Sequence, residues 1–358
     1  MADPVKTRNV FLDTECFDAG GFNYSSKPFK ILGSLATSGE VRVYVTEVTL
    51  REVKAHISEA VTEAVRLHKR FGREARILRN SKLKTATQVL LPPDRTTIEA
   101  ELIAQFERYL KEAQSTVLHT DNMKAGPVLE SYFQSKPPFG AGQKKSEFPD
   151  AFALAAVREW CSKNKQEIYV VSGDSDMQSA CDENGPLYAL QKLSDFLNLL
   201  ASDDKALSSF LRAEIGKREQ EIEKRIGEMF ESELGFILED QDGDVDEVSV
   251  SGVSLDEVEI LQTEEDYADL QVEATIEFDA YLTYVDHDNS VWDSEDKRFI
   301  FTEYAHETVR RKESLPVDIS VTFKGLDPDS FNIVQISFTD TKKPVLVNAD
   351  EGDGWPYK

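Results

Sequence analysis

The stretch from Phe148 to Met177 most constrains the fold, because it joins a helix pattern to a buried-strand pattern and places carboxylates on both. The segment F-P-D-A-F-A-L-A-A-V-R-E-W has apolar residues near helical spacing, and its Pro149-Asp150 pair is typical of a helix start. The apolar run 168–171 is rich in β-branched residues, as in a parallel sheet covered on both faces. The sequence S-G-D-S-D follows it. Ligands of open α/β sheets bind at such carboxyl ends of strands, so we expect a site there.

The first 200 residues alternate between strand and helix patterns. Residues 9–14 predict a central first strand that ends near Asp13, and residues 41–46 predict a second. From Glu47 a long helical pattern begins, with Glu52 in its first turns. Further helices are expected at 96–113, 125–134 and 192–200, and a strand at 187–189. This alternation indicates a parallel α/β sheet.

Charge divides the chain of 358 residues into unlike halves. Its formal net charge is −25, and residues 1–200 contain 26 acidic and 26 basic side chains. The whole acidic excess therefore lies after residue 200, where several stretches alternate as half-exposed antiparallel strands do. We predict an α/β domain at 1–200, a charged connecting helix within 201–240, and an acidic α+β domain with an antiparallel sheet at 241–358.

Four carboxylates occupy places that the predicted fold would bring together. Asp13 and Asp174 follow two strands, Asp150 lies at a helix start, and Glu52 lies near the start of the long helix. Each one alone has a plainer explanation, as a turn residue, a helix cap or a solvated helix residue. Their joint placement favours a metal site, because crowded carboxylates repel one another unless a cation lies between them.

Four sequence pieces, V-F-L-D-T, T-E-V-T-L-R-E-V, K-K-S-E-F-P-D-A-F-A-L and V-V-S-G-D-S-D-M, resemble PIN-domain nucleases, and within them the PIN-like type of larger bacterial proteins. The resemblance covers roughly residues 8–200 and implies a three-layer α/β/α fold around a parallel sheet. It implies a catalytic, metal-binding set of acids in which Glu47 is a rival to Glu52. The set is Asp13, Glu52, Asp150 and Asp174, with Asp176 as a fifth metal-binding member. Ser172 and Met177 depart from the Thr and Phe that the family often has.

The implied metal is Mg²⁺ or Mn²⁺, because hard cations take oxygen ligands. One ion or two could bind. Asp13, Asp150 and Asp174 would be ligands, and Glu52 would be a ligand or position the attacking water. Ser172 and Asp176 would contact these ligands and hold them in position.

Basic residues near the predicted site offer contacts for phosphate. Lys69 and Arg70 belong to a basic run at 66–84, and Lys144 and Lys145 lie in a loop just before Asp150. The run is equally well explained as a solvated helix face or as an RNA-contacting face.

We therefore expect a divalent-metal-dependent endoribonuclease, toxin-like or acting in phage defence by analogy. The alternatives are a catalytically silent scaffold that binds a protein, and a structure-specific DNA nuclease. The acidic domain would bind a protein partner or inhibitor, and a homodimer is a further option. The acidic loop at 239–247, at the start of this domain, does not have the spacing of a calcium loop. No membrane-spanning run or signal region is evident, and the three cysteines have no metal-site spacing, so we expect a cytoplasmic protein.

Overall fold

The computed structural model describes residues 5–19, 21–121, 123–139, 147–181, 185–202, 205–239, 241–293 and 298–349. The chain divides into two compact units, Met1–Leu200 and Ala201–Lys358, each considered by itself below. Among the helices described, none is long and apolar enough to cross a membrane.

The first unit contains a five-stranded parallel sheet with the order β3-β2-β1-β4-β5. The strand predicted as central, β1, does lie in the middle, and all four of its residues are buried. β1 pairs directly with β4, so that Leu12 lies opposite Val171. The strands are β1 (Asn9–Leu12), β2 (Arg42–Thr46), β3 (Thr116–Leu118), β4 (Ile168–Val171) and β5 (Leu187–Leu190).

Helices cover both faces of this sheet. On one face Phe11 and Val170 pack in one core with Leu154 and Val157 of α7. On the other face the ring of Tyr169 lies 5.5 Å from that of Phe196 in α9. These layers confirm the predicted three-layer α/β/α fold. The helices are α1 (Thr14–Asp18), α2 (Lys27–Thr37), α3 (Glu47–Glu74), α4 (Lys84–Gln88), α5 (Arg95–Glu112), α6 (Ala125–Gln134), α7 (Phe148–Asn164), α8 (Ser175–Ser179) and α9 (Leu193–Ala201).

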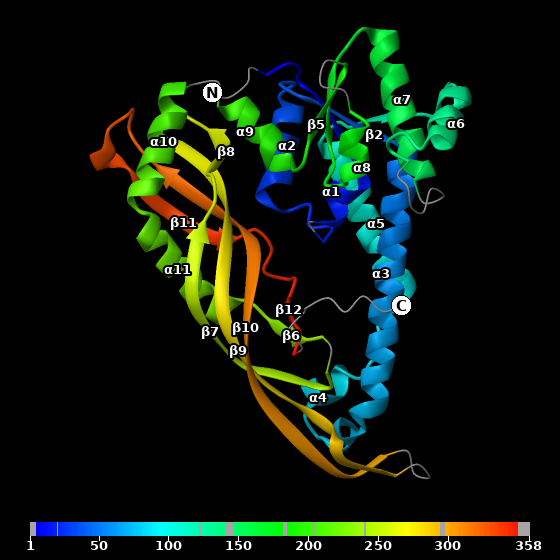
Figure 1. Ribbon diagram of the computed structural model, residues 1–358, viewed down its shortest axis with the longest axis vertical. Helices are drawn as coiled ribbons and strands as arrows, with labels where there is room; N and C mark the ends of the chain where they lie inside the picture. Colours follow the sequence, from blue (N-terminus) through cyan, green and yellow to red (C-terminus); the bar gives the residue numbers. More distant parts are fainter. Residues whose placement is uncertain are drawn as a thin grey trace. The chain divides into compact units, whose positions relative to one another are not determined.

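The long helix α3 has a packed beginning and an exposed end. Thr46 caps it by accepting a hydrogen bond from the Thr49 backbone N–H, at 3.1 Å. Its buried side chains recur every four residues up to Val65, and none is buried beyond that point. Figure 1 shows α3 continuing beyond the sheet, with α4 beside its distal end. The 3-10 helix η1 (Arg76–Asn80) precedes α4, and neither element has a buried residue.

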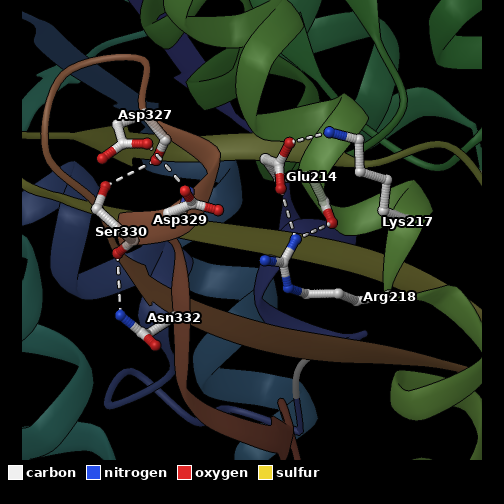
Figure 2. A network of polar contacts seen from close by, with 7 residues as sticks. All are labelled: Glu214, Lys217, Arg218, Asp327, Asp329, Ser330 and Asn332. Atoms are coloured by element: carbon white, nitrogen blue, oxygen red, sulfur yellow. Dashed lines mark hydrogen bonds and ion pairs between the residues drawn. The ribbon is translucent and has the colours of Figure 1, made fainter.

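The second unit packs two helices on antiparallel strands. The segment predicted as one charged helix forms two, α10 (Lys205–Lys217) and α11 (Glu219–Glu233), which meet at Arg218. Their apolar residues belong to the core of this unit, so they do more than connect. The buried Glu214 carboxylate accepts from Lys217 at 2.5 Å and from Arg218 at 2.6 Å. The Arg218 guanidinium also lies 4.7 Å from the centre of the Phe331 ring. Figure 2 shows the ion pairs of Glu214 beside the turn that carries Asp327, Asp329, Ser330 and Asn332.

The main sheet of this unit has the order β11-β10-β9-β7, with β8 also paired to β9. This confirms the predicted antiparallel sheet. A parallel pair, β6 with β12, lies outside that sheet. The strands are β6 (Phe236–Leu238), β7 (Gly243–Leu255), β8 (Glu259–Thr263), β9 (Tyr267–Asp293), β10 (Arg298–Thr322), β11 (Asn332–Phe338) and β12 (Val345–Val347).

The strands of this unit extend beyond the stretches that alternate. The polar segment 303–314 is part of β10, which pairs with β9 along its whole length. Exposed cross-strand ion pairs accompany that pairing, such as Arg310 with Asp279 at 3.0 Å. The end of the predicted acidic loop, from Gly243 to Glu247, is the beginning of β7.

Candidate active site

Asp13 and Ser172 leave the sheet side by side, because β1 and β4 are parallel neighbours. The Asp13 backbone N–H donates to the Val171 carbonyl at 3.1 Å. The Ser172 hydroxyl donates to Asp13 Oδ2 at 2.8 Å, and both side chains are buried. Burial raises the pKa of Asp13 to about 6, against the hydrogen bonds from Ser172 and Thr14, with smaller upward contributions from the charges of Glu52 and Glu15.

Asp174 follows in the same turn as Ser172. Its backbone N–H donates to Ser172 Oγ at 3.1 Å, so this one hydroxyl connects the two acid positions. One oxygen of Asp174, Oδ1, accepts from the backbone N–H groups of Asp176 and Met177, which makes Asp174 the N-cap of α8. The plain capping explanation of Asp174 is therefore correct, and it leaves Oδ2 without a role in the cap.

Glu52 reaches the same end of the sheet from α3. Thr14, directly after Asp13, donates from its hydroxyl to Glu52 Oε2 at 2.8 Å. The rival Glu47 is engaged elsewhere, since its carboxylate accepts from the Thr120 backbone N–H at 2.9 Å and from the Thr120 hydroxyl. The geometry therefore groups Glu52, and not Glu47, with Asp13.

Asp150 lies in the first turn of α7, which begins at Phe148, so it is not the cap residue that the sequence suggested. The rings of Phe139 and Tyr132 lie 5.1 and 5.0 Å from that of Phe148 and form an apolar wall at this helix start. Desolvation, together with the smaller contributions of the charges of Asp13, Glu52, Asp174 and Glu147, raises the pKa of Asp150 to about 7. All four predicted acids are thus near enough to interact electrostatically.

The sequence reasoning missed Glu15, in the first turn of α1. Burial raises its pKa, followed by the charges of Asp174 and Asp18. Its carboxylate lies against Gly173, where an added Cβ would come within 2.9 Å of Glu15 Oε1. Gly173 therefore leaves space for a fifth carboxylate. The available signal was the sequence D-T-E, which puts Glu15 two residues after Asp13, in the first turn of the helix that Asp13 precedes.

Other predicted site residues are not drawn into this cluster. Asp176 contributes its backbone N–H to the cap of α8. Lys69 and Arg70 lie on the exposed end of α3, about 27 Å along the helix from Glu52 at 1.5 Å per residue. Lys144 and Lys145 lie outside the described residues.

The donor set suits a hard divalent cation in its chemistry, because it consists of carboxylates that raise one another's pKa. Within the described parts of the chain, however, no three or more His, Cys, Asp or Glu side chains are arranged to hold a metal ion. The carboxylates are close neighbours whose oxygens do not converge on one point.

Comparison with known proteins gives a match for the part of the chain that contains these acids. Residues 10–177 match the family model described as PIN domain. Neither the curated proteins nor the solved structures yielded a match. The matched segment runs from β1 to α8 and contains all four interacting acids. The parallel sheet, the acids at its edge and the family match together show that residues 10–177 belong to the PIN-domain family, which has a nuclease-type fold.

Proposed function

We infer that this protein is an endoribonuclease that hydrolyses RNA phosphodiester bonds with the help of a divalent cation. One arrangement carries the inference: Asp150, in the first turn of α7, lies near Asp13, Glu52 and Asp174 at the carboxyl end of the sheet, where desolvation and these charges raise its pKa to about 7. Such crowding is unfavourable for ionised carboxylates alone and suits a cation between them.

Asp13, Asp150 and Asp174 are the residues that would hold Mg²⁺ or Mn²⁺. The bound ion would supply an activated water and stabilise the departing oxygen of the phosphodiester. Ser172 positions Asp13 through its hydroxyl and fixes the turn that carries Asp174. Glu52 Oε2 is bound by Thr14, which leaves Oε1 to join the ligands or to orient the attacking water.

RNA is proposed over DNA because the resemblance is to a family whose small members cut RNA. The test is cleavage of labelled single-stranded RNA and of a DNA flap substrate with Mg²⁺ or Mn²⁺. Asp13→Asn and Asp150→Asn should each lower RNA cleavage by a hundredfold or more. Glu52→Gln should lower it strongly, whereas Glu59→Gln, an exposed carboxylate on the same helix, should leave it near wild type. Undiminished cutting in the first two variants would refute this mechanism, and preference for the flap would favour a DNA nuclease.

A toxin-like or phage-defence role follows by analogy, with the acidic second unit as the binding module for a protein partner or inhibitor. Residues 201–358 hold the whole acidic excess of the chain and so repel RNA. Induced expression tests the toxic effect. Growth should stop with the wild-type chain and continue with Asp13→Asn, and equal growth would contradict the toxin-like role.

A further inference from the structure

Residues 66–91, named here the basic arm, are unlike the rest of the chain in charge and exposure. Eight of their nine charged residues are Lys or Arg, in a chain with a net charge of −25. All eight cations are exposed: Arg66, Lys69, Arg70, Arg73, Arg76, Arg79, Lys82 and Lys84. The arm comprises the end of α3, η1, α4 and the residues that follow it. Figure 1 shows these elements at the far end of α3.

The cations on α3 share one side of the helix. At 100° per residue, Arg66, Lys69, Arg70 and Arg73 fall within about 100° of one another, opposite the buried stripe that ends at Val65. Exposed pairs with Glu63 and Glu74 involve Arg66 and Arg70, but such pairs are weak and give way to phosphate readily. This face can therefore follow an anionic backbone.

The arm also exposes several apolar side chains. Leu67, Ile77, Leu83 and Leu91 are each more than half exposed, and Phe71 is 41% exposed. The rings of Phe71 and His68 lie 6.3 Å apart beside the cations. His68 is fixed by a 2.8 Å hydrogen bond between its Nε2 and the Val89 carbonyl. Aromatic rings among cations form the usual stacking platform for unpaired bases.

We propose that the basic arm is an anchoring site for single-stranded RNA, separate from the carboxylate cluster. This inference rests on the proposed RNA substrate. Exposed aliphatic groups alone would suit an acidic protein equally well. The rings and the predominance of Arg favour RNA, because Arg binds phosphate through a bidentate fork and rings stack on bases.

The length of α3 sets the span between the two sites. Glu52 and Arg70 are 18 residues apart, which is about five turns and about 27 Å. The anchored strand need not follow the helix surface between them, where Glu59 and Glu63 project. At a stacked spacing of about 3.4 Å, roughly eight nucleotides cover that distance. A six-nucleotide RNA with stacked bases therefore does not span both sites, whereas a twenty-nucleotide RNA does.

The test measures RNA affinity of the full-length chain in EDTA, so that metal-dependent cutting does not interfere. The twenty-nucleotide RNA should bind at least tenfold more tightly than the six-nucleotide RNA. The triple variant Lys69→Gln, Arg70→Gln, Arg73→Gln should remove most of that difference. It should also reduce the dependence of log affinity on log salt by about 2, since each phosphate contact on single strands contributes about 0.7. The matched control Arg108→Gln, Lys111→Gln, Lys163→Gln removes three exposed charges from the same unit and should change neither quantity.

Stacking is tested by a second pair of variants on one helix. Phe71→Ala should weaken binding of the long single strand fivefold or more, and Leu67→Ala, which removes an exposed side chain without a ring, should not. Equal affinity of the triple variant and the wild type for the twenty-nucleotide RNA would refute the anchoring role of the basic arm. Duplex RNA that binds as tightly as the single strand would refute it as well. Failure of metal-dependent cleavage in the same preparations would reject the nuclease proposal instead.

Discussion

Ser172 donates a 2.8 Å hydrogen bond to the carboxylate of Asp13, a residue 159 positions away in the chain. The Ser172 Oγ also accepts a hydrogen bond from the Asp174 backbone N–H at 3.1 Å. One buried hydroxyl thus joins the ends of β1 and β4.

Replacing Ser172 with alanine should weaken the site without unfolding the protein. The lost hydrogen bond lowers the pKa of Asp13, so its removal should raise that pKa further. We expect roughly tenfold lower cleavage and a pH–rate profile displaced to higher pH. The free energy of unfolding should fall by only about 1 kcal/mol, the usual contribution of one hydrogen bond. Ser172→Thr keeps a hydroxyl and should restore the profile. An unshifted profile in Ser172→Ala would exclude the positioning role.

Asp13→Asn should abolish cleavage and at the same time stabilise the protein in EDTA at pH 8. The buried carboxyl has a pKa of about 6 against an ordinary value of 3.8, so its ionised form disfavours folding by roughly 3 kcal/mol. Asn is neutral, has nearly the same shape and still accepts from Ser172. Thermal unfolding measures the effect. The gain should shrink at pH 5, where Asp13 is protonated. The comparison variant is Asp94→Asn, at an exposed α5 cap where Thr97 and Thr96 lower the pKa, and it should not stabilise. A lower melting temperature for Asp13→Asn would contradict the account.

Divalent-cation binding should release protons near pH 6 to 7. Without metal, Asp150 titrates at about 7 and Asp13 at about 6, and cations bind only the ionised forms. Apparent Mn²⁺ affinity should therefore rise with pH through this range and level off near pH 8. The stability of the metal-free protein should change in the opposite direction. Unfolded carboxyls lose their protons near pH 4 and the folded ones keep theirs to higher pH, so stability falls as pH rises between about 4 and 7.

Calorimetry in two buffers of different ionisation enthalpy would count the released protons. A pH-independent Mn²⁺ affinity between pH 5.5 and 8 would show that neither carboxyl takes part in binding.

Glu214 should behave in the reverse manner to the site carboxyls. Lys217 and Arg218 lower its pKa, so its contribution to stability is present above the unfolded pKa near 4.5 and is lost as pH falls through the lower folded value. Glu214→Gln should lower the melting temperature of the second unit by several degrees at pH 7 and leave RNA cleavage by the first unit intact. The difference from wild type should disappear in strong acid. An equal melting temperature at pH 7 would refute the ion-pair contribution.

The sheet and the proximity of the four acids could be predicted because their signals are local. The run 168–171 is apolar throughout, and each acid follows a strand or lies in the first turns of a helix. The place of Glu15 beside the other acids could not be predicted, because it depends on contact with Gly173, which follows a different strand. The strand at the charged segment 303–314 could not be predicted, because pairing with β9 determines its structure and burial in a core does not. The single helix predicted within 201–240 is instead divided at Arg218, whose side chain contacts Glu214 and Phe331.

We propose that acids from the end of β1, from α3, from α7 and from the turn after β4 bind one cation. The anomalous difference map of a crystal of the full chain soaked in Mn²⁺ tests this. We expect a peak within about 2.0–2.4 Å of carboxylate oxygens of Asp13, Asp150 and Asp174, lost in the Asp150→Asn crystal. Full-occupancy manganese elsewhere, with no peak among these residues, would contradict it.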